Sequence, residues 1–231
     1  MSASSLRSIL QDRTIHPVVP FDPDNDRLYR FDFTDKNTDL LPDQVADTES
    51  FARHIESTLG IHHCRYGVGG YAEHRTLYAR SRHFDTSSGP RRLHLGTDIW
   101  GPAGTKVMAP LGGIVHSFAF NNQDGDYGAT LILTHNLEGF GFHTLYGHLS
   151  LNSLKNLHEG MRVRGGDTIG EFGMRFENGN WPPHLHFQLI LDLQDWKGDY
   201  PGVCKFSEKE QWLANCPDPD LLLHMSIYAE Q

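Results

Sequence analysis

Three short motifs combine histidines with a carboxylate in a pattern that suits a metal centre. In chain order they are His94-x-Gly96-x-Asp98, Tyr146-Gly147-His148-Leu149 and Pro183-His184-Leu185-His186-Phe187-Gln188. A catalytic zinc ion takes three protein ligands from His, Asp, Glu or Cys and keeps one position open for water. The chain has 15 histidines, so about one His-x-His pair is expected by chance. The prediction therefore depends on the order of the motifs and on the strand-like, glycine-rich segments around them.

Strand periodicity predicts how these side chains are directed. Residues i and i+2 of a strand point to the same face, so His184 and His186 are expected to project together. The apolar residues that alternate with them would face the core. The same rule predicts that Thr144, Tyr146 and His148 share one face. A three-ligand site would leave two side chains for proton transfer and for stabilising an oxyanion, but spacing does not indicate which two.

Composition and periodicity favour a mainly β fold. The chain has 23 glycines and 12 prolines, which favour many turns. Short β-prone runs lie between glycine-rich turns at residues 107–110, 113–118, 130–135, 142–146, 168–172 and 185–191. This spacing is typical of an antiparallel β-sandwich or barrel-like sheet. Nearer the N-terminus, Phe51, Ile55 and Leu59 recur at helical spacing before Gly60, which predicts one short amphipathic helix.

The chain is divided here into three parts. Residues 1–90 form an N-terminal extension that packs on the core, residues 91–191 carry the motifs, and residues 192–231 form a C-terminal appendage. The net charge of -9 argues against nucleic acid or an anionic membrane as the main partner. We see no apolar segment typical of a signal peptide or a membrane helix, and the three cysteines are scattered. A cytoplasmic location is therefore expected.

The ordered motifs resemble the LytM/lysostaphin-type zinc metallopeptidases of family M23, which have a duplicated-hybrid-motif-like domain. The similarity extends over roughly residues 91–191. Besides the histidine motifs it includes Gly104-Thr105-x-Val107-x-Ala109-Pro110, Tyr127-Gly128, Leu131-Ile132-Leu133-x-His135 and Gly160-x-x-Val163-x-x-Gly166. The family fold implies a β-sheet with a groove over one face.

The resemblance also implies roles for individual residues. Zinc would be held by His94, Asp98 and His186, and the catalytic imidazoles would be His148 and His184. The family hydrolyses peptide bonds, commonly glycine-containing bonds or cross-links of peptidoglycan. The resemblance therefore predicts a zinc metalloendopeptidase that acts on a peptide or peptidoglycan-derived substrate.

The chain departs from the family pattern at several places. Gln188 stands where the family usually has Glu, and the loop at residues 174–182 replaces a small, Thr/Gly-rich segment. Several members carry a tyrosine shortly before the first ligand, but residues 85–93 contain none. Tyr71 or Tyr78 could take that place. These departures affect the walls of the groove, so substrate preference is open.

Two alternatives to the peptidase remain. One is an M23-like zinc-binding module with little or no peptidase activity, which acts as a binding or regulatory domain. The other is a cupin-type metal protein, but this would need a Glu soon after the His-x-His pair and a further His nearby, whereas the next one is His224. Among the neighbouring residues, Glu73 and Arg75 could edge the groove, but an exposed ion pair is the favoured interpretation. His135 and His143 are expected to lie outside the chemistry.

Overall fold

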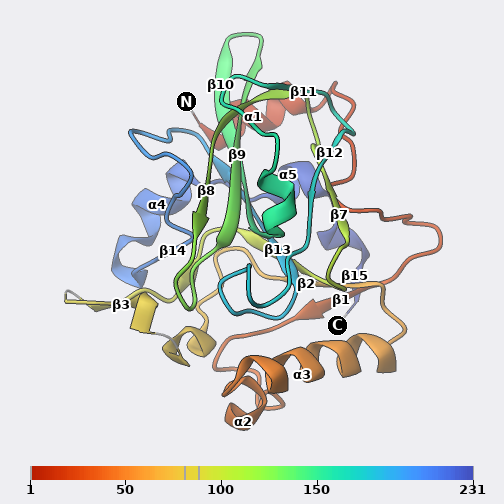
Figure 1. Ribbon diagram of the computed structural model, residues 1–231, viewed down its shortest axis with the longest axis vertical. Coiled ribbons are helices and arrows are strands. Elements are labelled where there is room, and N and C mark those ends of the chain that lie inside the picture. Colours follow the sequence, from red (N-terminus) through yellow and green to blue (C-terminus); the bar gives the residue numbers. More distant parts are fainter. Residues whose placement is uncertain (1, 81, 88, 231) are drawn as a thin grey trace.

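A nine-stranded sheet forms the centre of the computed structural model, which describes residues 2–80, 82–87 and 89–230 (Figure 1). Its strands, in spatial order, are β11 (Arg162–Val163), β8 (Gly113–Asn121), β9 (Gly128–Leu137), β10 (Phe140–Leu149), β13 (His184–Ile190), β6 (Thr97–Trp100), β2 (Tyr66–Gly69), β1 (Leu28–Phe31) and β15 (Ala229–Glu230). Neighbouring strands run antiparallel from β11 to β2, and β1 pairs in parallel with both β2 and β15. The predicted mainly β fold is confirmed, with a parallel part added at one edge.

Smaller elements surround this sheet. Three two-stranded ladders pair β7 (Lys106–Met108) with β12 (Thr168–Glu171), β5 (Leu93–His94) with β14 (Val203–Cys204), and β3 (Asp85–Thr86) with β4 (Gly89–Pro90). The α-helices are α1 (Ala3–Leu10), α2 (Pro42–Val45), α3 (Thr48–Ile61), α4 (Lys209–Asn215) and α5 (Asp220–Leu223). Short 3-10 helices are η1 (Thr76–Arg80), η2 (Arg82–Phe84), η3 (Leu151–Leu154), η4 (Phe206–Glu208) and η5 (Ser226–Tyr228). Within the described ranges, no helix is both long enough and apolar enough to cross a membrane.

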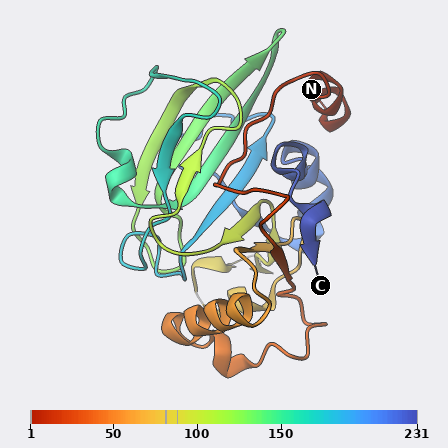
Figure 2. The ribbon, with the colours of Figure 1, turned by 90° about the vertical axis from the view of Figure 1, so that its right-hand side faces the viewer.

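Helix α3 confirms the predicted amphipathic helix and begins a few residues earlier. The Asp47 side chain accepts a hydrogen bond from the Ser50 amide at 2.8 Å, which satisfies a free N–H of the first turn. Phe51, Ile55 and Leu59 are buried on one face of the helix. They pack beside the β1–β2 edge of the sheet, where Figure 2 shows the helix beneath the strands.

Both faces of the central strand β13 are covered, so all seven of its residues are buried. Leu185, Phe187 and Leu189 lie in the main apolar core, as the alternation predicts. On the opposite face, His184, His186 and Gln188 are also buried, and this is where the polar side chains gather. A strand buried on both faces thus separates an apolar layer from a polar one.

Strand β10 loses its regular alternation where it reaches His148. The pairing with β9 shifts register beyond Tyr146, and His148 has a left-handed φ of 63°. The Tyr146 ring lies in the apolar core, 5.3 Å from the ring of Phe187. The His148 ring lies 4.1 Å from that of His184 on the polar side. The expectation that Tyr146 and His148 share one face is therefore wrong, because the irregular backbone turns His148 over.

Candidate active site

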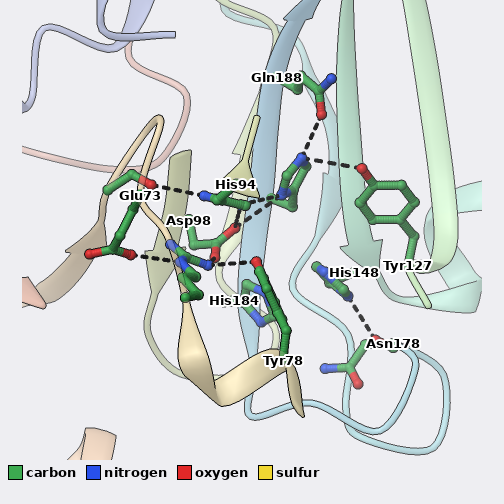
Figure 3. Close-up of polar contacts among 12 residues, drawn as sticks. Glu73, Tyr78, His94, Asp98, Tyr127, His148, Asn178, His184 and Gln188 are labelled. Carbon is green, nitrogen blue, oxygen red and sulfur yellow. Dashed lines mark hydrogen bonds and ion pairs between the residues drawn. The ribbon is translucent and has the colours of Figure 1, made fainter. Parts of the chain in front are cut away.

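Three buried side chains from neighbouring strands converge on one point. His94 ends β5, Asp98 lies in β6, and His186 lies opposite Asp98 in β13. His94 Nε2 is 3.0 Å from His186 Nδ1, and Asp98 Oδ1 is 3.3 Å and 3.1 Å from these two nitrogens (Figure 3). Within the described part of the chain, these residues form a group of side chains that could hold a metal ion.

Each of these three side chains is oriented by an outer partner. His94 Nδ1–H donates to the Gly70 carbonyl at 2.9 Å, which leaves the Nε2 lone pair facing the group. His186 Nε2–H donates to Gln188 Oε1 at 2.9 Å, which leaves the Nδ1 lone pair facing it. Asp98 Oδ2 is bonded to Arg75, so Oδ1 is the oxygen that points inwards. Outer partners of this kind fix the tautomer and orientation of metal ligands.

The electrostatics keep His94 and Asp98 in the forms that bind a metal. Burial lowers the pKa of His94 to about 4, so the ring is neutral near pH 7. Burial alone would raise the pKa of Asp98, but neighbouring His94 and Arg75 hold it well below its usual range. Neutral imidazole and ionised carboxylate are the ligand forms that metals require.

His148 and His184 lie beside this group with their rings 4.1 Å apart. Each Nδ1–H donates to a backbone carbonyl, that of Asn178 at 2.8 Å for His148 and that of Pro182 at 2.7 Å for His184. Each Nε2 therefore carries a lone pair, and among the described residues neither has a hydrogen-bond partner. Burial lowers the pKa of His184 to about 4 and that of His148 well below its usual range. Both rings can accept a proton at Nε2.

The loop at residues 173–182 supplies the carbonyls that hold these two rings. Asn178 is buried and organises the loop, because its side-chain amide donates to the carbonyls of Gly173 at 3.1 Å and Trp181 at 3.0 Å. Its Oδ1 accepts from the Trp181 amide at 3.0 Å. The segment singled out as a departure from the family pattern is therefore built into the site.

Aromatic side chains support and line the site. The Trp100 ring stacks on His184 with 3.9 Å between centroids, and Phe51 of α3 lies 5.4 Å behind Trp100. A pocket opens in front of the five side chains, and its walls include Phe84, Trp181, Trp196 and Tyr200.

Two tyrosines, Tyr78 and Tyr127, lie at the site, and the sequence pattern predicted a role there only for Tyr71 or Tyr78. Tyr78 lines the pocket and its hydroxyl accepts from Arg75 at 2.9 Å. Tyr71 lies elsewhere and donates to the Cys216 carbonyl at 2.6 Å. The Tyr127 hydroxyl is 3.3 Å from His186 Nε2, opposite Tyr78. Tyr127 appeared in the sequence analysis only as part of a family motif.

Glu73 and Arg75 form the predicted ion pair, but the prediction that it is exposed is wrong, and Arg75 lines the pocket. Arg75 is 1% exposed and its guanidinium bonds both Glu73 and Asp98. The partner Asp98 lies far along the chain, so no local spacing marks the contact. His135, by contrast, bonds to the Gly112 carbonyl away from the site, as expected.

Part of the chain is similar to known peptidases. Residues 92–197 match the model described as Peptidase family M23. Peptidoglycan DD-endopeptidase ShyC from Vibrio cholerae serotype O1 is 30% identical over 120 residues, which are 48% of this chain and 25% of that protein. The chain thus spans about a quarter of the length of this relative.

Two solved structures are also similar. The catalytic domain of lysostaphin from Staphylococcus simulans is 27% identical, with 58% of this chain and 80% of that chain covered and a TM-score of 0.40. A zinc-containing peptidase from Vibrio cholerae is 28% identical, with 46% of this chain and 29% of that chain covered and a TM-score of 0.35.

Proposed function

Because residues 92–197 belong to peptidase family M23, we propose that the protein is a zinc-dependent endopeptidase. Its substrates are peptide bonds of peptidoglycan-type or glycine-rich peptides. The family supports peptide hydrolysis, and the peptidoglycan endopeptidase among the relatives supports the substrate class.

One observation carries the proposal. Three ligand-type atoms converge, and two further imidazoles beside them present unbonded Nε2 atoms. A metal site that served only the fold would use all its polar groups as ligands or bond them internally. Here His148 and His184 remain available for chemistry.

The residues present fit zinc. Two imidazole nitrogens and one carboxylate oxygen are ligands that zinc prefers in catalytic sites, and three protein ligands leave a position open. We assign His94 Nε2, Asp98 Oδ1 and His186 Nδ1 as these ligands. Zinc held there would lower the pKa of a water molecule towards 7 and polarise the carbonyl of the scissile bond.

His148 and His184 supply the proton transfers. A neutral imidazole takes the proton from the attacking water at its Nε2 and later returns it to the leaving amine. The second imidazole takes a proton from solvent at Nε2 as negative charge develops on the carbonyl oxygen, donates it in a hydrogen bond to the oxyanion, and releases it again when the tetrahedral species collapses. Because each Nδ1–H is held by a backbone carbonyl, both Nε2 atoms keep their direction through the reaction. The pair shares the roles of base and oxyanion stabiliser.

The proposal is tested by metal analysis joined to a cleavage assay on the full chain. Purified protein should bind one equivalent of zinc and cleave pentaglycine or cross-linked muropeptides. His186→Ala should lose the zinc, because two ligands cannot form the site. His158→Ala is the matched control, since His158 is exposed and outside the pocket, and it should keep both zinc and activity.

The assay also separates the alternative function. Protein that binds stoichiometric zinc but cleaves none of these peptides would support an M23-like binding or regulatory module instead. Protein that neither binds zinc nor cleaves would contradict both assignments.

A further inference from the structure

A buried arginine connects the proposed metal site to the segment before it. The Arg75 side chain is 1% exposed, and its Nε donates to Glu73 Oε2 at 2.6 Å. Its Nη1 donates to the Tyr78 hydroxyl at 2.9 Å and also bonds Asp98 Oδ2. Glu73, Arg75 and Asp98 thus form a line of alternating charges that ends on a proposed ligand.

The guanidinium is tightly confined. It lies over the Phe33 ring at 5.4 Å and over the Tyr78 ring at 5.6 Å. A Cβ placed on Gly69 would come within 2.7 Å of Arg75 Nη2, so the backbone of β2 closes the third side. The confinement leaves the guanidinium no other position from which to reach Asp98.

Glu73 is fixed as firmly as the arginine. Its Oε1 accepts from the Phe33 amide at 3.2 Å, while Oε2 holds Arg75. The Glu73 carbonyl accepts from the His94 amide at 2.9 Å, and the Gly70 carbonyl accepts from His94 Nδ1 at 2.9 Å. The stretch from Gly70 to Arg75 therefore contacts two of the three proposed ligands. This stretch lies outside residues 92–197, which match the family.

We propose that Arg75, held by Glu73, is a positioning residue for the metal centre. It engages Asp98 Oδ2, so that Asp98 offers Oδ1 alone and binds through one oxygen. The inference rests on the proposed zinc site. It does not require that the protein cleave any particular peptide.

The consequence for metal binding follows from geometry. Without the guanidinium, the Asp98 carboxylate can rotate and either oxygen can turn away from His94 and His186. Loss of an outer partner of a metal ligand typically lowers metal affinity by about 10–100-fold. Lysine cannot replace the planar fork, because one ammonium does not span Glu73 and Asp98 with the same geometry.

A purely structural role for Arg75 leads to a different result. If the ion pairs only joined the Gly70–Arg75 stretch to the core, their loss would lower the stability of the fold. The zinc affinity of the molecules that remain folded would then be unchanged. Metal affinity and ligand geometry, measured on folded protein, separate the two roles.

The experiment compares the full chain with Arg75→Ala, Arg75→Lys and Glu73→Gln. Arg92→Ala is the matched control, because Arg92 is a largely buried arginine that pairs with a carboxylate, Asp85, but does not line the pocket. Zinc dissociation constants are measured by competition with a chelator, and circular dichroism reports folding. Bound cobalt is then used as a probe, since its absorption bands depend on the number and geometry of ligands.

We expect about a 10–100-fold weaker zinc affinity for both Arg75 variants and a smaller loss for Glu73→Gln. The cobalt spectra of the Arg75 variants should change, and methylguanidinium should restore part of the affinity of Arg75→Ala. Arg92→Ala should match wild type. If Arg75→Ala does not fold, the affinity and spectrum of Arg75→Lys decide the outcome.

Folded Arg75 variants with wild-type zinc affinity and wild-type cobalt spectra would overturn the inference. Wild-type protein that binds no divalent metal would overturn both the inference and the zinc assignment. Wild-type protein that binds zinc but cleaves no peptide would count only against the proposed peptidase. In that case an affinity loss in the Arg75 variants would still support the positioning role.

Discussion

Buried histidines lie on both faces of the same sheet, and they differ in whether the second ring nitrogen has a hydrogen-bond partner. On the apolar face, His135 bonds the Gly112 carbonyl through Nδ1 at 2.9 Å and the Thr144 hydroxyl through Nε2 at 2.8 Å. On the polar face, His148 and His184 bond a carbonyl through Nδ1, and the described residues offer nothing to Nε2. Both ring nitrogens of His135 are hydrogen-bonded, so this ring supports the fold. The rings of His148 and His184 line the pocket, and each keeps an Nε2 atom available for a hydrogen bond.

Burial alone does not distinguish these histidines. It lowers the pKa of His135 to about 4, which is also the value for His184. A shifted pKa is therefore shared by a residue that supports the fold and one that we assign to chemistry. The number of satisfied ring nitrogens is the property that separates them.

The largest effect, on kcat, is expected from removing one of the two imidazoles whose Nε2 has no hydrogen-bond partner among the described residues. His184→Ala should lower kcat by about 10²–10⁴-fold, because one proton-transfer or oxyanion-stabilising group is lost. The zinc content should stay at wild-type level, since His184 is not among the proposed ligands. Steady-state kinetics together with metal analysis checks both parts. Wild-type turnover in His184→Ala would remove His184 from the mechanism.

The second prediction concerns how the unfolding free energy falls in acid because of His135, whose two ring nitrogens are both hydrogen-bonded. Above pH 6.5, His135 is neutral in both states and contributes no pH dependence. As the pH falls from about 6.5 to about 4, His135 becomes protonated in the unfolded chain but stays neutral in the folded protein, because burial lowers its pKa. Stability is therefore lost over this window, by up to about 3 kcal/mol, with no further loss from this residue below it.

Urea unfolding across this pH window checks the second prediction, with His135→Gln as the comparison. The variant should show a flatter decline of the unfolding free energy than wild type, because its amide does not titrate. Both proteins are measured with chelator present, so that metal loss contributes equally. Parallel curves would show that His135 does not carry the linkage.

The smallest effect is expected from removing the Thr144 hydroxyl, which is the hydrogen-bond partner of His135 Nε2. Thr144→Val keeps the shape but removes the hydrogen bonds to His135 Nε2 and to the Tyr146 hydroxyl, which should cost about 1–3 kcal/mol of unfolding free energy because buried polar atoms lose their partner. The kcat should not change, because Thr144 is on the apolar face. Denaturant unfolding and kinetics on the same sample provide the measurement. A loss of kcat at full folding would connect the two faces and weaken the comparison.

The sequence predicted those features of the site that follow from the local periodicity of a strand. The two-residue period correctly placed His184 and His186 together and sent Phe187 to the core. The same period failed at His148, because a left-handed residue at a register shift reverses the side chain. The residue type gives little warning of the irregularity, because few non-glycine residues adopt a positive φ, even though histidine does so more often than most.

Contacts between distant segments could not be read from the sequence. Arg75 reaches Asp98 only because β2 pairs with β6 and brings the following turn against β5. The carbonyls of the 173–182 loop meet His148 and His184 through the folded loop and not through a motif. The roles of the five site residues are assigned from the family resemblance, and the variants of His184 and His186 test two of them.

The pairing of β2 with β6 has a practical consequence for anyone who wishes to shorten the chain. A fragment that began where the family match begins would leave β6 as an open sheet edge, with unpaired amides and carbonyls exposed along it. Open edges recruit strands from other molecules and favour aggregation. The same cut would strip the hydrogen-bond partner from His94 and the guanidinium from Asp98. The part of the chain that builds the proposed active site is therefore larger than the segment that matches the family.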